Sequence, residues 1–210
     1  MDANRAAQVM AALQALYPEA KPELHFRNPY ETLIATILSA QCTDKRVNQV
    51  TARLFPLYPD AFAMAKLTPA ELEPMIRECG LYHNKAKNII AASRALVEQY
   101  DGQVPATRKE LMALPGVGQK TAGVVLLAAF GDDQIPVDTH VFRVSRRIGL
   151  ADANTPEKVE GQLKALLDKD IWSLGHHLII WHGRRCCHAR RPECERCPLN
   201  EGLCEKHMES

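Results

Sequence analysis

Apolar residues recur along the chain at intervals of three and four positions, and no stretch shows the sustained alternation of a half-buried strand. This periodicity predicts an all-α fold. Asn28 precedes Pro29, and Glu31 stands at the capping-box position, which predicts a helix from there to about Ala40. Thr43 is predicted to cap the next helix.

Later helices are separated by glycine and proline signals, among them Gly80, Asp101-Gly102 and Gly131. They are predicted around residues 72–76, 85–100, 120–130, 138–148, 156–168 and 172–185. The longest apolar run, 124–130, is much shorter than the roughly twenty apolar residues that a membrane helix needs, so we expect no membrane partner.

The chain has 210 residues, of which 46% are hydrophobic, enough for one large or two small helical domains. Its formal net charge of +1 argues against indiscriminate adhesion to nucleic acid, so any affinity for DNA has to come from locally placed charge. Arginines do gather locally. They could bind DNA, or they could form solvated faces whose charge is balanced by glutamates. They are Arg143, Arg146 and Arg147, and then Arg184, Arg185, Arg190, Arg191 and Arg196.

A glycine-flanked turn, L-P-G-V-G-Q-K-T-A over residues 114–122, stands directly before an apolar helix. Gly116 and Gly118 permit backbone angles and close approaches that a side chain would block. The turn can therefore press its amide groups against a phosphate at a helix N-terminus.

Lys120 follows in the first helical turn, where the positive end of the helix dipole disfavours an ammonium ion and favours a neutral amine that can attack carbon. Eighteen residues later, Asp138 supplies the opposite charge. Asp138 also fits the N-cap of a helix. From these residues alone the segment could equally be a helix-hairpin-helix that only holds DNA, with Lys120 as one more phosphate contact.

Residues 114–130 and 137–147 resemble the helix-hairpin-helix DNA glycosylases, in which L-P-G-V-G-x-K-T-A is followed by V-D-T-H-x-x-R. In the branch with lysine at this position, the lysine is the nucleophile and the aspartate its acidic partner. The resemblance therefore implies Lys120 and Asp138 as catalytic residues. Residues 28–44 and 79–90 also resemble endonuclease III, so the resemblance covers nearly the whole chain.

The same resemblance implies residues that contact DNA. Gln41 would offer an amide to the partner base that loses its pair, and Leu81 would enter the duplex as an apolar wedge. By itself a leucine at a helix end is more typical of a core, and a glutamine there of an exposed turn. The implied DNA-binding residues are Gln41, Leu81, Gly116, Val117, Gly118 and Gln119.

Four cysteines near the C-terminus have the spacing C-x6-C-x2-C-x6-C, which indicates a metal site. They are Cys187, Cys194, Cys197 and Cys204. Disulfides are less favoured, because we expect no secretory signal and seven cysteines is an odd number. The spacing alone does not separate zinc from an iron-sulfur cluster.

Resemblance favours a [4Fe-4S] cluster, because endonuclease III ends in a four-cysteine loop with intervals of six, two and five residues. Here the last interval is six. Cys186 is a neighbouring competitor for the first ligand, but the family spacing selects Cys187. Cys42 and Cys79 stand apart along the chain and are given no metal role.

The resemblance implies two helical modules that flank a DNA-binding groove: residues 22–132, and residues 1–21 together with 133–210. It implies a monomeric DNA glycosylase/AP lyase of base excision repair in the bacterial cytoplasm, associated with the nucleoid. Its substrate would be double-stranded DNA that contains damaged bases, with oxidised pyrimidines expected, or abasic sites.

Two alternatives remain at this point. One is a monofunctional adenine or mismatch glycosylase, against which the lysine at position 120 argues. The other is a non-catalytic or redox-sensing DNA-binding protein on the same fold, which would not need both Lys120 and Asp138.

Overall fold

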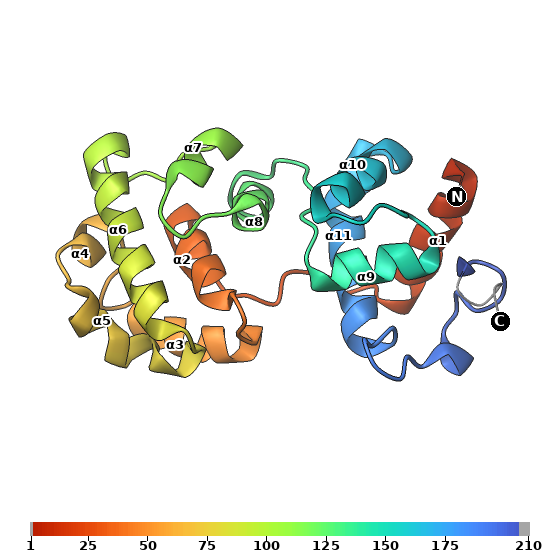
Figure 1. Cartoon of the computed structure of the whole chain (residues 1–210), viewed down its shortest axis with the longest axis horizontal. Coiled ribbons are helices and arrows are strands. Elements are labelled where there is room, and N and C mark those ends of the chain that lie inside the picture. Colours follow the sequence, from red (N-terminus) through yellow and green to blue (C-terminus); the bar gives the residue numbers. More distant parts are fainter. Residues whose placement is uncertain (1, 206–210) are drawn as a thin grey trace. The chain divides into compact units, whose positions relative to one another are not determined.

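The computed structural model describes residues 2–205 and divides them into two compact units (Figure 1). We call residues 22–132 the central unit, and residues 2–21 with 133–205 the terminal unit. Residues 2–205 form helices, turns and loops without a strand, which confirms the all-α prediction. Among these described residues, no helix is long and apolar enough to cross a membrane.

The central unit is built around one helix that is buried on all sides. This helix, α2, has nine consecutive buried residues from Tyr30 to Leu38, as expected of a helix enclosed by others. The helices of this unit are α2 (Pro29–Ser39), α3 (Asp44–Leu54), α4 (Ala61–Ala65), α5 (Pro69–Ile76), the 3-10 turn η1 (Arg77–Cys79), α6 (Tyr82–Tyr100), α7 (Arg108–Ala113) and α8 (Gln119–Phe130). Their apolar faces form one core.

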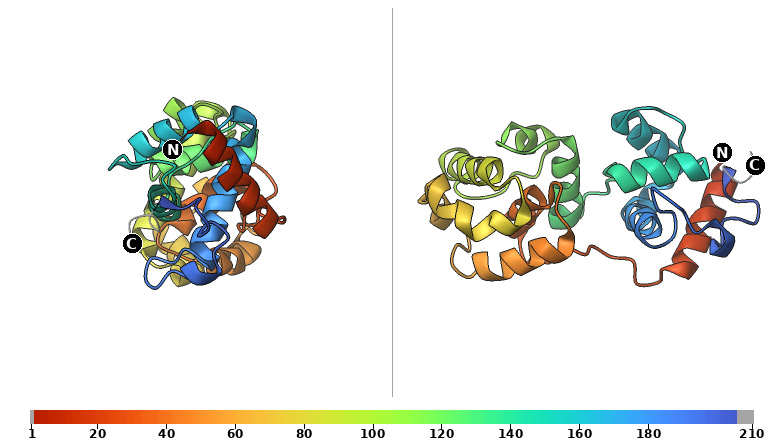
Figure 2. Two further views of the ribbon diagram at one scale, coloured as in Figure 1. Left: turned by 90° about the vertical axis from the view of Figure 1, so that its right-hand side faces the viewer. Right: turned by 60° about the horizontal axis from the view of Figure 1, so that its bottom comes forward.

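The terminal unit joins the two ends of the chain, since its N-terminal helix packs with helices that follow residue 138 (Figure 2). Its helices are α1 (Ala3–Leu16), α9 (Thr139–Ile148), α10 (Pro156–Leu166), η2 (Lys169–Ile171), α11 (Trp172–Arg185) and η3 (Cys194–Arg196). They enclose a second core, which reaches the cysteine loop through Leu199.

The predicted cap at Asn28 is present, because its side chain accepts a hydrogen bond from the Glu31 amide at 2.9 Å. The prediction of a capping box at this place was wrong. The Glu31 carboxylate is buried and instead accepts the Arg27 amide and pairs with the Arg27 guanidinium. A buried carboxylate needs a cationic partner more than a second amide. A complete capping box closes at Thr68 and Glu71.

Several helix ends differ from the predicted ones. Helix α6 begins at Tyr82, three residues before the predicted start, and α10 ends at Leu166, two residues before the predicted end. Helices α1, α4 and α7 lay outside the predicted segments. The signal for α1 was present, since its buried residues recur at intervals of three, one and three. The starts at Thr43 and Trp172 agree with prediction.

Candidate active site and metal centre

Helices α7 and α8 and the turn between them form the predicted helix-hairpin-helix. Gly116 has a φ of +79°, and a Cβ atom there would lie 2.8 Å from the Cβ of Asn88 on α6. The protein's own packing therefore requires glycine at this position. Gly118 is different, because its backbone is extended and, apart from its chain neighbours, no atom of the described residues lies within 4 Å of the place of a Cβ. The packing of the protein therefore does not itself require glycine at position 118.

The predicted DNA-contacting residues of the hairpin differ in exposure. The side chain of Val117 is buried, so Val117 can offer only its backbone to a ligand. Gln119 is exposed, and its Oε1 accepts a hydrogen bond of 3.0 Å from Nη1 of Arg108 on α7. Arg108 was missed by the sequence analysis, because eleven residues separate it from Gln119. It brings a guanidinium to the N-terminus of α8.

Lys120 is the second residue of α8 and is exposed. The buried face of this helix is formed by Ala122, Val125 and Leu126, which belong to the central core. Lys120 therefore lies at the positively polarised end of a helix whose opposite face is anchored.

Gln41 and Leu81 share an uncommon backbone conformation. Gln41 has a φ of 52° and Leu81 a φ of 47°, in the left-handed region that favours glycine. Both side chains are exposed, and Leu81 retains 54% of its accessible surface. The view of Leu81 as an ordinary core residue is therefore wrong. Left-handed non-glycine residues are characteristic of ligand clamps and switch regions.

Asp138 is the N-cap of α9 and belongs to the terminal unit. Its Oδ1 accepts two backbone hydrogen bonds of 2.8 Å, from the amides of His140 and Val141. The expected capping role is therefore present. His140 has its Nδ1 3.3 Å from Nη2 of Arg143, and burial lowers the pKa of this histidine.

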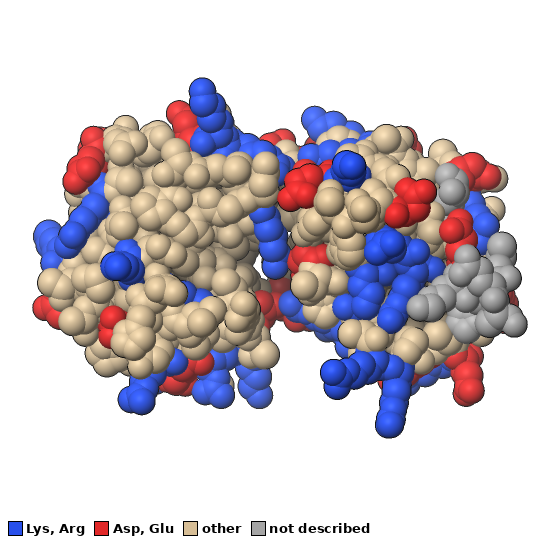
Figure 3. Space-filling model, in the orientation of Figure 1, with Lys and Arg blue, Asp and Glu red and all other residues tan. Residues whose placement is uncertain are grey.

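Two arginines of α9 bind the start of the cysteine loop. Arg143 donates from Nη2 to the carbonyls of Gly183 and Cys187 at 3.0 Å each. Arg147 donates to the carbonyls of His188 and Ala189, at 2.6 and 3.1 Å. These two guanidiniums are therefore used to hold the loop. Lysine and arginine side chains gather over α9 in the space-filling view (Figure 3).

Arg147 also touches the two ends of the four-cysteine motif. Its Nη1 lies 3.6 Å from Sγ of Cys187, and its carbonyl accepts a hydrogen bond of 3.3 Å from Sγ of Cys204. All four predicted ligands are half-buried, and no cysteine of the described residues forms a disulfide. A loop of four thiols beside a guanidinium fits an anionic group held by four thiolates.

Cys197 has further polar neighbours. Its Sγ lies 3.6 Å from Nε2 of the buried His182, whose Nδ1 lies 3.2 Å from the hydroxyl of Tyr17. Burial lowers the pKa of His182 to about 4, so the ring is neutral at pH 7. Neutral imidazole beside a thiolate is an ordinary outer contact of a metal ligand.

Cys186 lies deeper than Cys187. Among residues 2–205, the one close group of three potential ligands is His182, Cys186 and Cys197, with ligand atoms within 4.8 Å of one another. This grouping was not predicted. Burial, followed by the Cys197 thiol nearby, raises the pKa of Cys186 to about 12. The choice of Cys187 over Cys186 stays a prediction.

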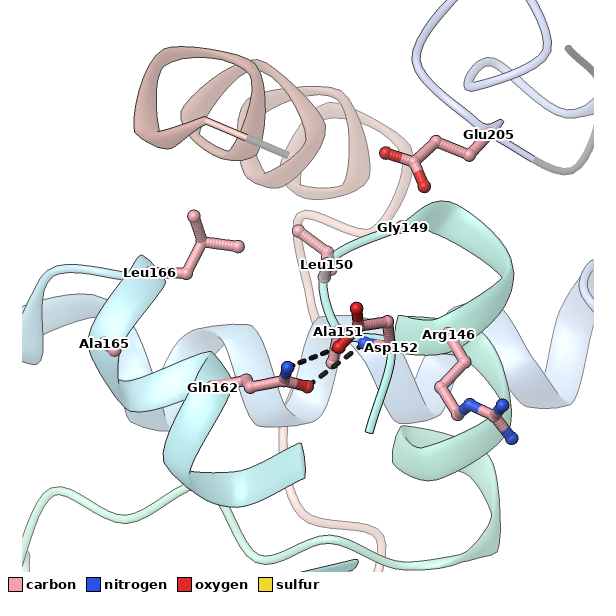
Figure 4. A pocket seen from close by; sticks show the side chains of 9 residues that line it. All are labelled: Arg146, Gly149, Leu150, Ala151, Asp152, Gln162, Ala165, Leu166 and Glu205. Atoms are coloured by element: carbon pink, nitrogen blue, oxygen red, sulfur yellow. Dashed lines mark hydrogen bonds between the residues drawn. The ribbon is translucent and has the colours of Figure 1, made fainter. Parts of the chain in front are cut away.

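An open pocket of about 580 Å³ lies elsewhere in the terminal unit (Figure 4). Arg146, Asp152 and Glu205 line it with Gln162, whose Oε1 accepts the amides of Asp152 and Ala153. None of the predicted site residues contributes to this lining.

Comparison with known proteins agrees with this geometry. The model of the HhH-GPD superfamily of base excision DNA repair proteins matches residues 34–169, and the iron-sulfur binding domain of endonuclease III matches residues 187–204. Endonuclease III of Synechocystis sp. is 48% identical over 197 residues, which cover 93% of this chain and 90% of the relative. Endonuclease III of Escherichia coli K12 is 43% identical over 98% of this chain and 97% of the relative. The chain belongs to the endonuclease III family.

Solved structures extend the similarity to three dimensions. A trapped endonuclease III–DNA covalent intermediate, in an estranged-adenine complex, matches with a TM-score of 0.94 and 44% identity over 100% of this chain and 98% of that one. A thermostable thymine-DNA glycosylase shares the fold at 24% identity, with a TM-score of 0.87 over 99% and 98% of the two chains. The protein is thus a base excision repair DNA glycosylase with abasic-site lyase activity, which acts on DNA and carries a [4Fe-4S] cluster.

Proposed function

We propose that Lys120 is the nucleophile and Asp138 its acidic partner, and that oxidised pyrimidines in duplex DNA are the preferred substrates. The observation that carries this proposal is the whole-chain similarity to a structure of an endonuclease III–DNA covalent intermediate. A covalent intermediate requires a nucleophile on the protein. Lys120 is an exposed amine at the N-terminus of α8, in the motif that the resemblance assigns to this role.

In the first step, the neutral Lys120 amine attacks the anomeric carbon of an extruded nucleotide and displaces the damaged base. The sugar ring opens as nitrogen and carbon form a Schiff base. Loss of a C2′ proton then expels the 3′ phosphate by β-elimination, which breaks the strand. Water finally hydrolyses the Schiff base and releases Lys120. These steps need no net electron transfer.

Asp138 contributes negative charge and proton transfer in this scheme. A carboxylate stabilises the cationic character that develops on the sugar as the base departs. Its Oδ1 is held by two amides of α9, which fixes the orientation of the carboxylate. The cap and the chemical role are therefore compatible in one residue.

The remaining contacts hold DNA. The hairpin amides around Gly118 and the N-terminus of α8 would bind a phosphate, with the Arg108 guanidinium beside Gln119 adding positive charge. Gln41 and Leu81 would fill the space that the extruded nucleotide leaves. We further propose that Cys187, Cys194, Cys197 and Cys204 hold the cluster. The cluster would shape the arginine-rich loop, and the enzyme would work at the bacterial nucleoid.

Borohydride trapping tests the assignment of the nucleophile. Reduction of the Schiff base should join the wild-type protein covalently to a duplex that carries an abasic site. Lys120→Ala should lose the adduct while it still binds the same DNA, because the hairpin is unchanged. Lys109→Ala, which removes an exposed lysine from α7, is the matched control and should keep the adduct.

Adduct formation by Lys120→Ala at the wild-type level would overturn the proposal. DNA binding by the wild type without any adduct or base release would instead favour the non-catalytic alternative. A panel of duplexes with different oxidised bases, measured with the wild type, tests the substrate class. Equal rates on oxidised pyrimidines and on undamaged pairs would contradict it.

A further inference from the structure

A buried ammonium group lies between the two segments that lead to Gln41 and Leu81. The side chain belongs to Lys85 on α6, which is only 4% exposed. Its Nζ donates two hydrogen bonds of 2.8 Å, one to the carbonyl of Leu38 and one to the carbonyl of Cys79. Lysine is among the residues least often buried, so this placement calls for a specific reason.

The two carbonyls occupy corresponding places in the chain. Leu38 belongs to the last turn of α2, where helical carbonyls lack intrahelical donors, and Gln41 follows three residues later. Cys79 ends η1, and Leu81 follows two residues later. One cation thus holds the backbone shortly before Gln41 and shortly before Leu81, two of the exposed residues in the left-handed conformation.

Local hydrogen bonds complete each turn. The Cys42 amide donates to the carbonyl of Ser39 at 3.1 Å, which closes the turn around Gln41. On the other segment, Gly80 and Leu81 both have positive φ, 65° and 47°, and the conformation is unfavourable only at Leu81, because glycine adopts it readily. Left-handed non-glycine residues cost on the order of 1 kcal/mol each and persist only where their surroundings hold them.

Burial of Lys85 has an electrostatic cost. Desolvation lowers its pKa, and the thiols of Cys79 and Cys42 act in the opposite direction. Two charge-assisted hydrogen bonds to carbonyls offset part of this cost. An apolar side chain of similar length would avoid the cost of burying the ammonium group, but it would leave the carbonyls of Leu38 and Cys79 without this donor.

We infer that Lys85 is a positioning residue that joins the Gln41 and Leu81 segments into one preorganised insertion element for duplex DNA. The inference rests on the proposed roles of Gln41 and Leu81. Held in advance, both side chains enter the duplex without loop ordering at the moment of binding. Lys85 itself is buried and touches no DNA.

The test compares two substrates, of which only one requires insertion. A duplex with an abasic site has a gap to fill and an unpaired partner base, whereas a single strand with an abasic site has neither. Single-turnover strand cleavage is measured on both. Lys85→Met keeps the length of the side chain and removes its donors, and Lys87→Met, at an exposed position on the same helix, is the matched control for lost charge.

We expect Lys85→Met, which removes both hydrogen bonds, to slow cleavage of the duplex by at least about tenfold, the scale of losing a single charge-assisted hydrogen bond, and to leave the single strand within twofold. Lys87→Met should change both substrates alike. An equal fall on both substrates for Lys85→Met, or no fall on either, would overturn the inference, because an unspecific loss of stability does not distinguish the substrates.

A fluorescence measurement gives the same test without catalysis. With 2-aminopurine opposite a stable abasic-site analogue, saturating wild-type protein should change the emission as the partner base is displaced. Lys85→Met should bind with a smaller change, whereas Lys87→Met should equal the wild type. An undiminished signal for Lys85→Met would refute the role. Because this readout needs no Schiff base, it stays informative if the proposed chemistry at Lys120 is wrong.

A double-mutant cycle separates positioning from general stability. If Lys85 acts through Leu81, then Lys85→Met should add less than threefold to the duplex defect of Leu81→Ala, although it costs about tenfold alone. Additive effects would contradict the coupling. Should Lys85→Met fail to fold, Lys85→Gln keeps one amide donor for these carbonyls. It should show an intermediate ratio of duplex to single-strand cleavage, and a wild-type ratio would overturn the inference.

Discussion

Asp138→Asn separates the capping role of this residue from its chemical role. The asparagine Oδ1 can accept the same two amide hydrogen bonds, from His140 and Val141, that the aspartate Oδ1 accepts at 2.8 Å. Asparagine and aspartate are about equally good N-caps, so only the favourable charge–dipole interaction is lost, roughly 0.3–1 kcal/mol. The terminal unit should therefore remain folded.

The effect on chemistry should be larger. Loss of one acid-base contribution slows a reaction by about a hundredfold, which corresponds to about 2.7 kcal/mol of activation free energy. Single-turnover release of an oxidised pyrimidine from a duplex measures this step directly. Denaturant unfolding of the same protein measures the free energy of unfolding. The activation free energy of base release should rise by about 2 kcal/mol more than the free energy of unfolding falls.

Asp2→Asn is the matched control within the same unit. Asp2 caps α1 through a hydrogen bond of 2.8 Å from the Arg5 amide to its Oδ1, and it is exposed. Its substitution changes the same charge at an equivalent helix position and should leave base release at the wild-type rate. If Asp138→Asn and Asp2→Asn slow base release equally, Asp138 is only a helix cap and the reasoning fails.

Four further predictions concern the hairpin and the cysteine loop. Gly116→Ala should destabilise the protein by about 1–3 kcal/mol in denaturant unfolding, because it forces a side chain into positive φ and against Asn88. Gly118→Ala should leave unfolding unchanged but weaken abasic-site binding; normal binding would show that no DNA approaches there. Cys187→Ser should lose the brown iron-sulfur absorbance and about four irons per chain, whereas Cys186→Ser should keep both. The opposite result would show that Cys186, not Cys187, is the first ligand of the cluster. Gln119→Arg should steepen the slope of log binding constant against log salt concentration by about 0.9 for duplex DNA. An unchanged slope would mean that residue 119 points away from the DNA phosphates.

The order of the motifs and the helical periodicity are local properties, so both could be predicted from the sequence. Helix α11 begins and ends where predicted, since its apolar period and flanking signals are contained in its own residues. The hairpin motif and the cysteine spacing identified the family for the same reason. Ends set by tertiary contacts were less predictable. Glu31 had a capping-box signature and instead pairs with Arg27, because a buried carboxylate takes the partner that neutralises its charge.

Other features arise only when segments distant in the sequence meet. Lys85 lies 47 residues from the carbonyl of Leu38, and Arg147 lies 40 residues from Cys187 and 57 from Cys204. No local pattern encodes such pairings, since each depends on which helix faces which. The exposure of Leu81 is of this kind, because the sequence made it an apolar residue at a helix end and only packing left it in solvent. The chain alone therefore determined most of the helices, the family and the reactive residue types. The tertiary structure decided which side chains are buried and which groups they bind, as for Lys85 beside the exposed Gln41 and Leu81, because burial and hydrogen-bond partners are properties of the packed chain.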